Sequence, residues 1–298
     1  MPEPVAPPPA TWLLTASLVP KCYWTRVPDG DPRPASFSPD GKKVGFIGWD
    51  RGYRPRVGLA RKGRIVPLTK PGLLVLDFAW MNDSRSLLVA YQKHRTTRLG
   101  VLSLKGKWAR MIKPDKNLAS DMTGLTVLRG DRFAVLSAMK SAGAVRPTDL
   151  YRIDLGTGRT VNLTGTPRLS EDWPHQIDRT RLLFTGGLLP EQTGGPTGWV
   201  GIFDLKKQSS VRLTGEHFLV DSATIAFGGN TAYFDTTYHN DTGIWSLDLK
   251  GGEPQNILPQ RDVVWPAVSP DGQSLLVKRV GTPGHHGPYF LLGLERSP

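Results

Sequence analysis

One pattern recurs six times along this chain of 298 residues: a turn, a short apolar strand, a polar gap, a second strand, a tight hairpin and a third strand. The apolar runs that follow the turns begin, in order, at Val44, Leu87, Phe133, Leu182, Ala232 and Leu275. Successive copies are therefore 43 to 50 residues apart. A repeat of that length, with several strands and no helical pattern, is typical of a β-propeller blade. The sequence predicts an all-β protein, a six-bladed β-propeller.

The fifth repeat shows how many strands one blade contains. Residues 222–227 are predicted to form an inner strand, and residues 231–235 and 244–249 the second and third strands. A Lys-Gly-Gly hairpin signal at 250–252 then leads to a short outer strand at 254–258. We therefore expect four antiparallel strands in each blade.

The sixth repeat differs, because the sequence after its third strand is too short for an outer strand. That third strand is expected at 289–294, and four residues follow it. Near the other end of the chain, residues 11–17 have the length and character of a strand. We expect this N-terminal strand to close the ring as the outer strand of blade six, which removes a free edge. Residues 1–10 are then a Pro-rich tail, and residues 11–298 form a single domain.

Two Ser-Pro-Asp-Gly turns, at 38–41 and 269–272, introduce the first and last copies of the repeat. In such a turn Pro fixes one φ angle, Asp caps the turn and Gly takes a positive φ. Turn chemistry accounts fully for Asp40 and Asp271. We therefore expect these aspartates to be structural.

These turns, the strands after them and the Asp-Leu-x-Thr-Gly hairpin at 154–158 resemble the TolB-like six-bladed propellers. The same repeat occurs in the propeller domains of prolyl-oligopeptidase-type peptidases. The resemblance covers about residues 11–296. It implies a scaffold role in the periplasm or outside the cell, while the absence of a recognisable signal segment leaves a cytoplasmic location open.

The formal net charge of +12 suits a nucleic acid, an acidic polymer or a membrane surface as partner, or solubility alone. The basic residues are scattered, often as pairs at turns such as Lys42-Lys43 and Lys206-Lys207, and form no long block. We therefore expect the charge to serve solubility. No stretch approaches the ~18 apolar residues of a membrane span. The lone Cys22 excludes an internal disulfide.

Binding residues are expected on one face of the ring. In an up-and-down meander the Ser-Pro-Asp-Gly turns and the hairpins share one face and are short. The links between second and third strands, and between blades, share the other face and are long and varied, as binding loops on a rigid scaffold tend to be. We call these the short-turn face and the long-loop face.

Candidate binding residues come from long links such as 49–55, 91–98, 165–173, 236–242 and 281–288. They are Trp49, Arg51, Tyr53, Tyr91, His94, Arg95, Trp173, Tyr238, His239, His285 and His286. Exposed aromatic residues beside Arg suit contacts with protein, sugar or nucleic acid. For Trp49 and Tyr91, packing on a neighbouring blade is the alternative.

The loop histidines also raise the question of a metal site. His239, His285 and His286 are the candidates, but no pair of histidines has the spacing of a local metal motif. We predict neither a metal nor another cofactor.

Two functions from different classes remain open. The sequence contains neither a Gly-x-Ser-x-Gly elbow nor a glycine loop that opens a helix to bind phosphate. The first reading is a non-enzymatic, monomeric scaffold that binds a protein or peptide through the long-loop face and the axial channel. The alternative is a metal-assisted lyase or hydrolase acting on acidic carbohydrate, since some propeller lyases of acidic sugars use histidines with a divalent metal. An acidic polymer is a further class of partner, favoured by the basic charge.

Overall fold

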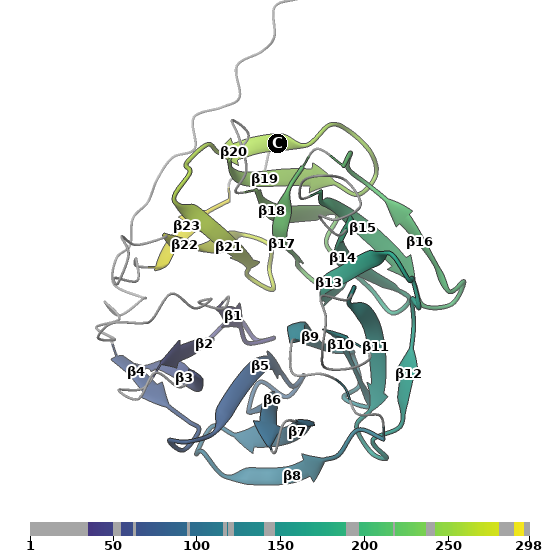
Figure 1. The fold of residues 1–298 in the computed structure, drawn as a ribbon. Coiled ribbons are helices and arrows are strands. Elements are labelled where there is room, and N and C mark those ends of the chain that lie inside the picture. The colour runs from purple at the N-terminus through teal and green to yellow at the C-terminus, as the bar shows by residue number, and fades with distance from the viewer. Residues whose placement is uncertain are drawn as a thin grey trace, which may run out of the picture.

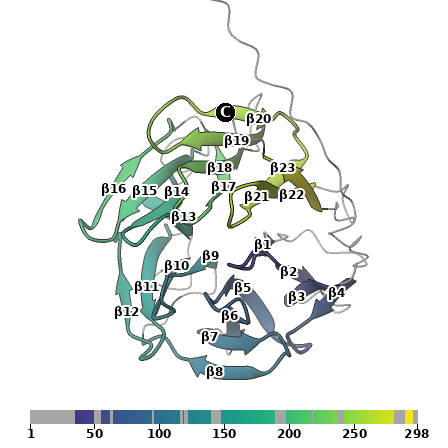
Figure 2. The same ribbon diagram turned by 180° about the vertical axis from the view of Figure 1, so that it is seen from behind.

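The structure is a computed structural model that describes residues 35–49, 55–61, 64–93, 96–115, 118, 122–139, 147–188, 197–216, 218–236, 242–279 and 289–294. Every regular element in these ranges is a β-strand. The strands form six antiparallel sheets arranged in a ring around one axis, as Figure 1 shows from one side and Figure 2 from behind. The six-bladed propeller predicted from the repeat is confirmed.

Within a blade the strands follow the chain from the axis outward. Blades one to three contain β1 (Ser36–Phe37), β2 (Val44–Trp49), β3 (Pro55–Arg61) and β4 (Arg64–Pro67); β5 (Leu74–Trp80), β6 (Ser86–Lys93), β7 (Thr96–Ser103) and β8 (Trp108–Ile112); and β9 (Met122–Val127), β10 (Phe133–Ala138), β11 (Asp149–Asp154) and β12 (Thr160–Asn162). Blades four to six contain β13 (Leu169–Gln176), β14 (Arg181–Leu188), β15 (Trp199–Asp204) and β16 (Ser209–Arg212); β17 (Val220–Ile225), β18 (Thr231–Thr236), β19 (Gly243–Asp248) and β20 (Gln255–Leu258); and β21 (Val263–Val268), β22 (Ser274–Arg279) and β23 (Tyr289–Gly293).

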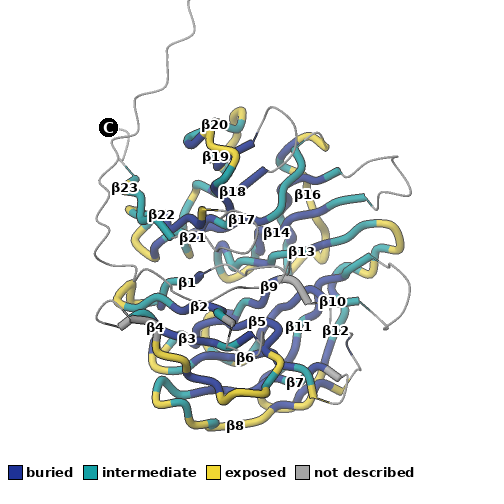
Figure 3. The backbone as a smooth tube through the Cα atoms, turned by 60° about the vertical axis from the view of Figure 1, so that its left-hand side comes forward, coloured by how far each residue is buried: buried dark blue, intermediate teal, exposed yellow. Residues whose placement is uncertain are grey.

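The hydrophobic core lies between the blades. Leu88 and Leu99 of blade two belong to the same buried cluster as Leu136 and Tyr151 of blade three. The second strand of a blade therefore has both faces covered, and its sequence is a nearly continuous apolar run. Among the outer strands, β16 is exposed along its whole length and β8 over most of it, and Figure 3 shows exposed residues toward the rim.

The predicted strands of blade five agree with β17 to β20 to within two residues at each end. Other links are shorter than predicted. The link 91–98 is wrong over most of its length, because β6 extends to Lys93 and β7 begins at Thr96. The link 165–173 is also partly strand, since β13 begins at Leu169. In both cases the ladder hydrogen bonds of the sheet continue past the polar residues that suggested a loop.

The sixth blade contains three strands within the described residues, whereas each of the other five sheets contains four. The repeat pattern likewise gave no outer strand after the third strand of this blade. The segment proposed to fill it, 11–17, lies outside the described residues. Ring closure by the N-terminal strand stays a prediction.

The Ser-Pro-Asp-Gly turns have the geometry that their residues predict. Gly41 has a φ of 69°, and the carboxylate of Asp40 accepts hydrogen bonds from Ser38 Oγ at 2.5 Å and from the Lys42 amide at 3.1 Å. These contacts, that from Ser38 above all, lower the pKa of Asp40 to about 2. Asp271 repeats the arrangement in blade six, so both aspartates are parts of the scaffold.

The short turns of neighbouring blades also bond to one another. The Asp40 amide donates to Ser84 Oγ at 3.0 Å, which joins blades one and two. The Asn82 amide donates to Asp131 Oδ1 at 2.9 Å, which joins blades two and three. The Arg129 amide donates to Gln176 Oε1 at 2.7 Å, and the Gly228 amide to the Ile177 carbonyl at 2.7 Å. This series of bonds fixes the short-turn face of blades one to five as one rigid surface.

Candidate functional site

The axis of the ring contains a cavity of about 230 Å³. Residues of β1, β5, β9, β13, β17 and β21 line it, so all six blades contribute their inner strands (Figure 1). The lining continues into the turns of the short-turn face, with Pro39, Asn82, Arg129, Phe227 and Pro270. Its polar side chains include Asp77, Thr126, His175, Gln176 and Thr224. Each inner strand is the edge of its sheet, and an edge strand presents unpaired amide and carbonyl groups along its free side. The cavity is therefore lined by backbone hydrogen-bonding groups as well as side chains.

Five of the inner strands are irregular. The pairing of β5, β9, β13, β17 and β21 with the second strand of the same blade shifts register part-way along each ladder. Such bulges bend a strand, increase its twist and redirect side chains, and they are frequent at functional sites. The bulges put extra residues on strands that surround the cavity.

Two of these bulges carry the dipeptide Trp-Pro, at Trp173-Pro174 and Trp265-Pro266. Trp173 and Trp265 have φ values of 51° and 53°, in the left-handed region that bulky residues rarely adopt. The dipeptide precedes the short turn in both repeats, so it is the sequence signal that could have located the bulges. Trp173 was expected on the long-loop face; it lies on β13 as a half-buried residue that lines the cavity.

Close backbone packing holds the bulge of β13 against blade three. A Cβ atom on Gly124 of β9 would lie 2.7 Å from the Cα of Trp173, and Gly124 has a φ of 81°. Both facts require glycine at this position. Blade three therefore fixes the position of Trp173 at the cavity.

Among the described residues, His175 is the histidine that lies at the axis. It lies on β13 and lines the cavity. Its enclosure by the ring lowers the pKa of the imidazole to about 4, because burial disfavours the charged form. The side chain is therefore neutral at pH 7 and can both donate and accept a hydrogen bond.

Acidic side chains gather between blades three and four, toward the long-loop face. Glu171 is 3% exposed; its Oε1 accepts a hydrogen bond from Thr166 Oγ1 at 2.6 Å and its Oε2 one from Thr164 Oγ1 at 3.2 Å. Burial above all, with the nearby carboxylates of Asp149 and Asp172, raises the pKa of Glu171 to about 8 despite these hydrogen bonds. Glu171 is therefore half protonated near pH 8, which is unusual for a carboxyl group.

A second buried carboxyl group joins blades five and six. Asp235 Oδ1 accepts from the Ser222 amide at 2.7 Å and from Ser222 Oγ at 2.9 Å, and Oδ2 accepts from the Trp265 amide at 2.9 Å. Burial, followed by the nearby Asp221, raises the pKa of Asp235 to about 7. Because Ser222 and Trp265 belong to two bulges, Asp235 holds the inner strands of both blades in place. Sequence reasoning missed both Glu171 and Asp235 in these roles, since each depends on a neighbouring blade.

Among the candidate binding residues, Tyr91 lies in the interior. It is 4% exposed and lies within β6, where it pairs with Val75 and Arg98. Its ring packs against Trp108, with the ring centroids 5.5 Å apart. The expected exposure of Tyr91 on the long-loop face is therefore wrong. Tyr91 packs in the interior, as the alternative predicted, but against Trp108 of its own blade and not against a neighbouring blade.

The other candidates have different outcomes. Trp49 is the last residue of β2 and pairs with Pro55, at the start of the link expected to bind. Arg51, Tyr53, His94, Arg95, Tyr238, His239, His285 and His286 lie outside the described residues, and their role stays a prediction. Within the described ranges no three His, Cys, Asp or Glu residues are grouped so that they could hold a metal ion. The described part of the chain also forms no helix that could span a membrane.

Comparison with known proteins supports the fold and leaves the activity open. No family model matches the sequence, and no curated protein matches it. Among solved structures, an oligogalacturonate lyase in complex with manganese is similar, with 12% identity, a TM-score of 0.61 and coverage of 90% of this chain and 78% of that one.

Two further structures are similar at 15% identity. A putative TolB from Agrobacterium tumefaciens has a TM-score of 0.58 and covers 77% of this chain and 87% of its own. The β-propeller domain of the trilobed protease from Pyrococcus furiosus, described as having an open velcro topology, has a TM-score of 0.56 and covers 87% of this chain and 78% of its own. The chain thus has the TolB-like six-bladed propeller fold that its repeats predicted.

Proposed function

We propose that this protein is a non-enzymatic scaffold that binds a protein or peptide segment at the long-loop face, with part of the segment entering the axial cavity. The observation that carries the proposal is the lining of the cavity by six inner strands, five of them bulged. Free strand edges offer amide and carbonyl groups, which are the complement of a peptide backbone. Trp173 and the neutral His175 add an aromatic surface and a group that both donates and accepts hydrogen bonds.

The size of the cavity limits what can enter it. About 230 Å³ is smaller than the cavities that enclose drug-sized ligands. A few side chains or an extended chain terminus fit this volume, whereas a folded domain does not. The rest of the partner would then contact the long links, from which Arg51, Tyr53, His94 and Arg95 are the candidate residues.

A random peptide library, selected on the immobilised full chain, tests this proposal. Thr126 lines the cavity and is half-buried, so Thr126→Trp would fill part of the space. Ser209→Trp places the same side chain on the exposed outer strand β16 as a matched control. We expect the selected peptides to bind at least about tenfold more weakly to Thr126→Trp, a loss of about 1.4 kcal/mol, and equally well to Ser209→Trp. Equal binding to both variants would rule out the cavity as the site.

The second candidate function is a metal-assisted lyase acting on acidic carbohydrate. It is favoured by the fold shared with the manganese-bound oligogalacturonate lyase, together with the net charge of +12. Its residues would be His239, His285 and His286. Incubation with oligogalacturonates and Mn²⁺ tests it, because β-elimination yields an unsaturated uronate that absorbs in the ultraviolet. No product and no thermal shift with Mn²⁺, Ca²⁺ or Zn²⁺ would eliminate this candidate.

A further inference from the structure

Three polar side chains lie at the same level of the axial cavity. They are Thr126 of β9, His175 of β13 and Thr224 of β17, and all three line the cavity. The register of the sheets pairs each of them with the third residue of the second strand of its own blade. Blades three, four and five therefore present a hydrogen-bonding group at equivalent positions around the axis.

These three side chains have no hydrogen-bond partner within the described part of the chain. The Thr224 hydroxyl is the most enclosed of them, since the residue is 5% exposed. For His175, burial is the only cause that lowers the pKa, so no neighbouring group donates to its ring or accepts from it. A buried polar group without a protein partner bonds to water or to a ligand. The cavity thus presents a row of groups whose partners must come from outside the protein.

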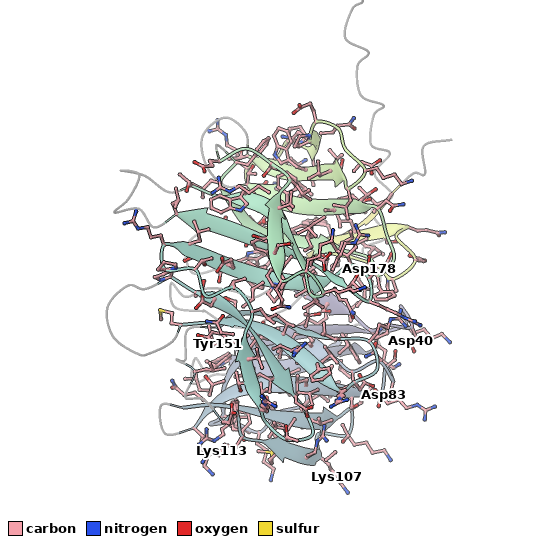
Figure 4. All side chains as sticks on the ribbon, turned by 90° about the vertical axis from the view of Figure 1, so that its right-hand side faces the viewer. Asp40, Asp83, Lys107, Lys113, Tyr151 and Asp178 are labelled. Atoms are coloured by element: carbon pink, nitrogen blue, oxygen red, sulfur yellow. The ribbon has the colours of Figure 1, made fainter. Side chains whose placement is uncertain are left out.

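The cavity opens on the short-turn face. Its lining includes exposed residues of the turns on that face, namely Arg129, Phe227 and Pro270. The same face lies at one side of the ring in Figure 4, which labels three aspartates of its turns, Asp40, Asp83 and Asp178. A small molecule in solution can therefore reach the cavity from this face.

A contact across blade four forms part of the rim of this opening. The guanidinium of Arg129, in a turn of blade three, lies 4.1 Å from the ring centroid of Phe227, in a turn of blade five. Arg129 follows Thr126 by three residues, and Phe227 follows Thr224 by three. The two threonine hydroxyls therefore belong to strand positions just inside the rim.

The chemistry of the lining favours a neutral ligand with several hydroxyl groups. A threonine hydroxyl and a neutral imidazole each donate and accept hydrogen bonds, as the hydroxyl groups of a sugar do. Among the described lining residues the basic ones are Arg129, at the rim, and His175, which is neutral at pH 7. The interior therefore offers no cation to an anionic ligand, and the buried carboxyl group of Asp77 in the lining also disfavours one. Burial that lowers the pKa of His175 disfavours a positive charge at the same level.

The volume of the cavity limits the ligand to the size of a small sugar. A cavity of roughly 150 Å³ encloses one benzene molecule, so about 230 Å³ has room for about ten non-hydrogen atoms. A five-carbon polyol or a pentose has that size. Its hydroxyl groups can replace ordered water and make the same hydrogen bonds, which is the condition under which displacing water costs no affinity.

We propose that the axial cavity binds a small neutral polyol or monosaccharide, which enters from the short-turn face and forms hydrogen bonds with Thr126, His175 and Thr224. This site shares the cavity with the peptide site proposed above. It does not rest on that site, because it needs no contact with the long links.

Saturation-transfer NMR of the full chain with sugars at a few millimolar tests the proposal. The neutral probes are D-xylose and xylitol; galacturonate is the anionic comparison, glucosamine the cationic one, and cyclohexanol a ring with a single hydroxyl. We expect D-xylose or xylitol to bind at least about tenfold more tightly than all three comparisons, a difference of about 1.4 kcal/mol. No transfer to the neutral probes would show that the three groups bond to water alone, and would overturn the proposal. Equal binding of galacturonate or glucosamine would overturn the neutral class.

Xylotriose distinguishes two sources of the same chemistry, because it carries the pentose ring at the end of a chain. Tighter binding of xylotriose than of D-xylose would assign the site to the end of a glycan. Weaker binding of xylotriose would assign it to a free sugar.

Substitutions of threonine by valine locate the site, because they remove a hydroxyl and keep the shape of the side chain. Thr126→Val and Thr224→Val should each bind the neutral probe at least about threefold more weakly, and the double variant at least about tenfold. Thr231→Val, on β18 and outside the cavity lining, is the matched control and should bind as the parent chain does. The cavity variants should not melt at a lower temperature, because their hydroxyls have no partner in the described protein to lose. Equal binding by the double variant and the parent chain would overturn the assignment to this cavity.

Discussion

Single carboxyl groups enclosed between blades make the stability of this protein depend on pH. Glu171 and Asp235 are buried with hydrogen bonds that neighbouring elements donate, yet burial raises the pKa of both. A raised carboxyl pKa means that the folded state binds protons more tightly than the unfolded state. The sequence shows two ordinary acids, and only the packing of one blade on the next changes their chemistry.

The Glu171 carboxyl should destabilise the fold as the pH rises. Its pKa is about 8 in the folded protein and about 4.3 in an unfolded chain, so the free energy of unfolding falls as the pH rises from about 5 to about 8. The contribution is on the order of 2–4 kcal/mol. Glu171→Gln removes the titrating group and should flatten this slope, leaving the smaller part due to Asp235. Urea unfolding between pH 5 and pH 8 measures how the free energy of unfolding changes with pH. Glu216→Gln, at an exposed position, is the control and should show the same pH dependence as the parent chain.

Gly124 should be irreplaceable, because its missing Cβ makes room for the Trp173 backbone. Gly124→Ala would combine a positive φ with a contact of 2.7 Å to Cα, and we expect a loss of about 3 kcal/mol or more. Gly130→Ala is the control in the same blade, since its φ is 94° but no atom lies within 4 Å of the added Cβ. Backbone strain alone should then cost about 1–2 kcal/mol. Chemical denaturation measures the free energy of unfolding of both variants. An equal loss in Gly124→Ala and Gly130→Ala would contradict the packing explanation.

At the scale of the element, the inner and outer strands of a blade have different tasks. The inner strands β5, β9, β13, β17 and β21 carry bulges and line the cavity, so their irregular pairing serves the site. The outer strands β4, β8, β12, β16 and β20 have three to five residues each, and they complete the sheets. Within the described residues the sheet of blade six contains three strands and ends at β23.

Residues 11–17 are predicted to cover that edge of β23. Deleting residues 1–18 should therefore lower the melting temperature by about 10 °C, since the ring would lose its closing strand. Deleting residues 1–10 removes only the Pro-rich tail and should leave the melting temperature unchanged. A thermal melt of the two truncated chains measures the difference. If both melt like the full chain, the N-terminal segment does not close the ring.

At the scale of the whole molecule, shared cores make the ring a single cooperative unit. The buried clusters contain residues of adjacent blades, so no blade has a complete core of its own. Leu136→Ala in one such cluster should lower the free energy of unfolding by about 2–5 kcal/mol. The melt should remain one transition, because loss of one blade exposes the apolar faces of its neighbours. Val211→Ala on the exposed rim is the control and should change little; two separate transitions would contradict a cooperative ring.

The sequence alone determined the repeat, the all-β class, the number of blades and the structural role of Asp40 and Asp271. These follow from local rules, namely strand periodicity and turn chemistry, which act over a few residues. Tertiary structure decided where Tyr91 and Trp173 lie, which carboxyl groups are buried, and which strands bulge around the axis. Those features depend on contacts between different strands, such as Trp173 with Gly124 of the preceding blade, Asp235 with Trp265 of the next blade, and Tyr91 with Trp108 of its own blade. No local pattern encodes such contacts.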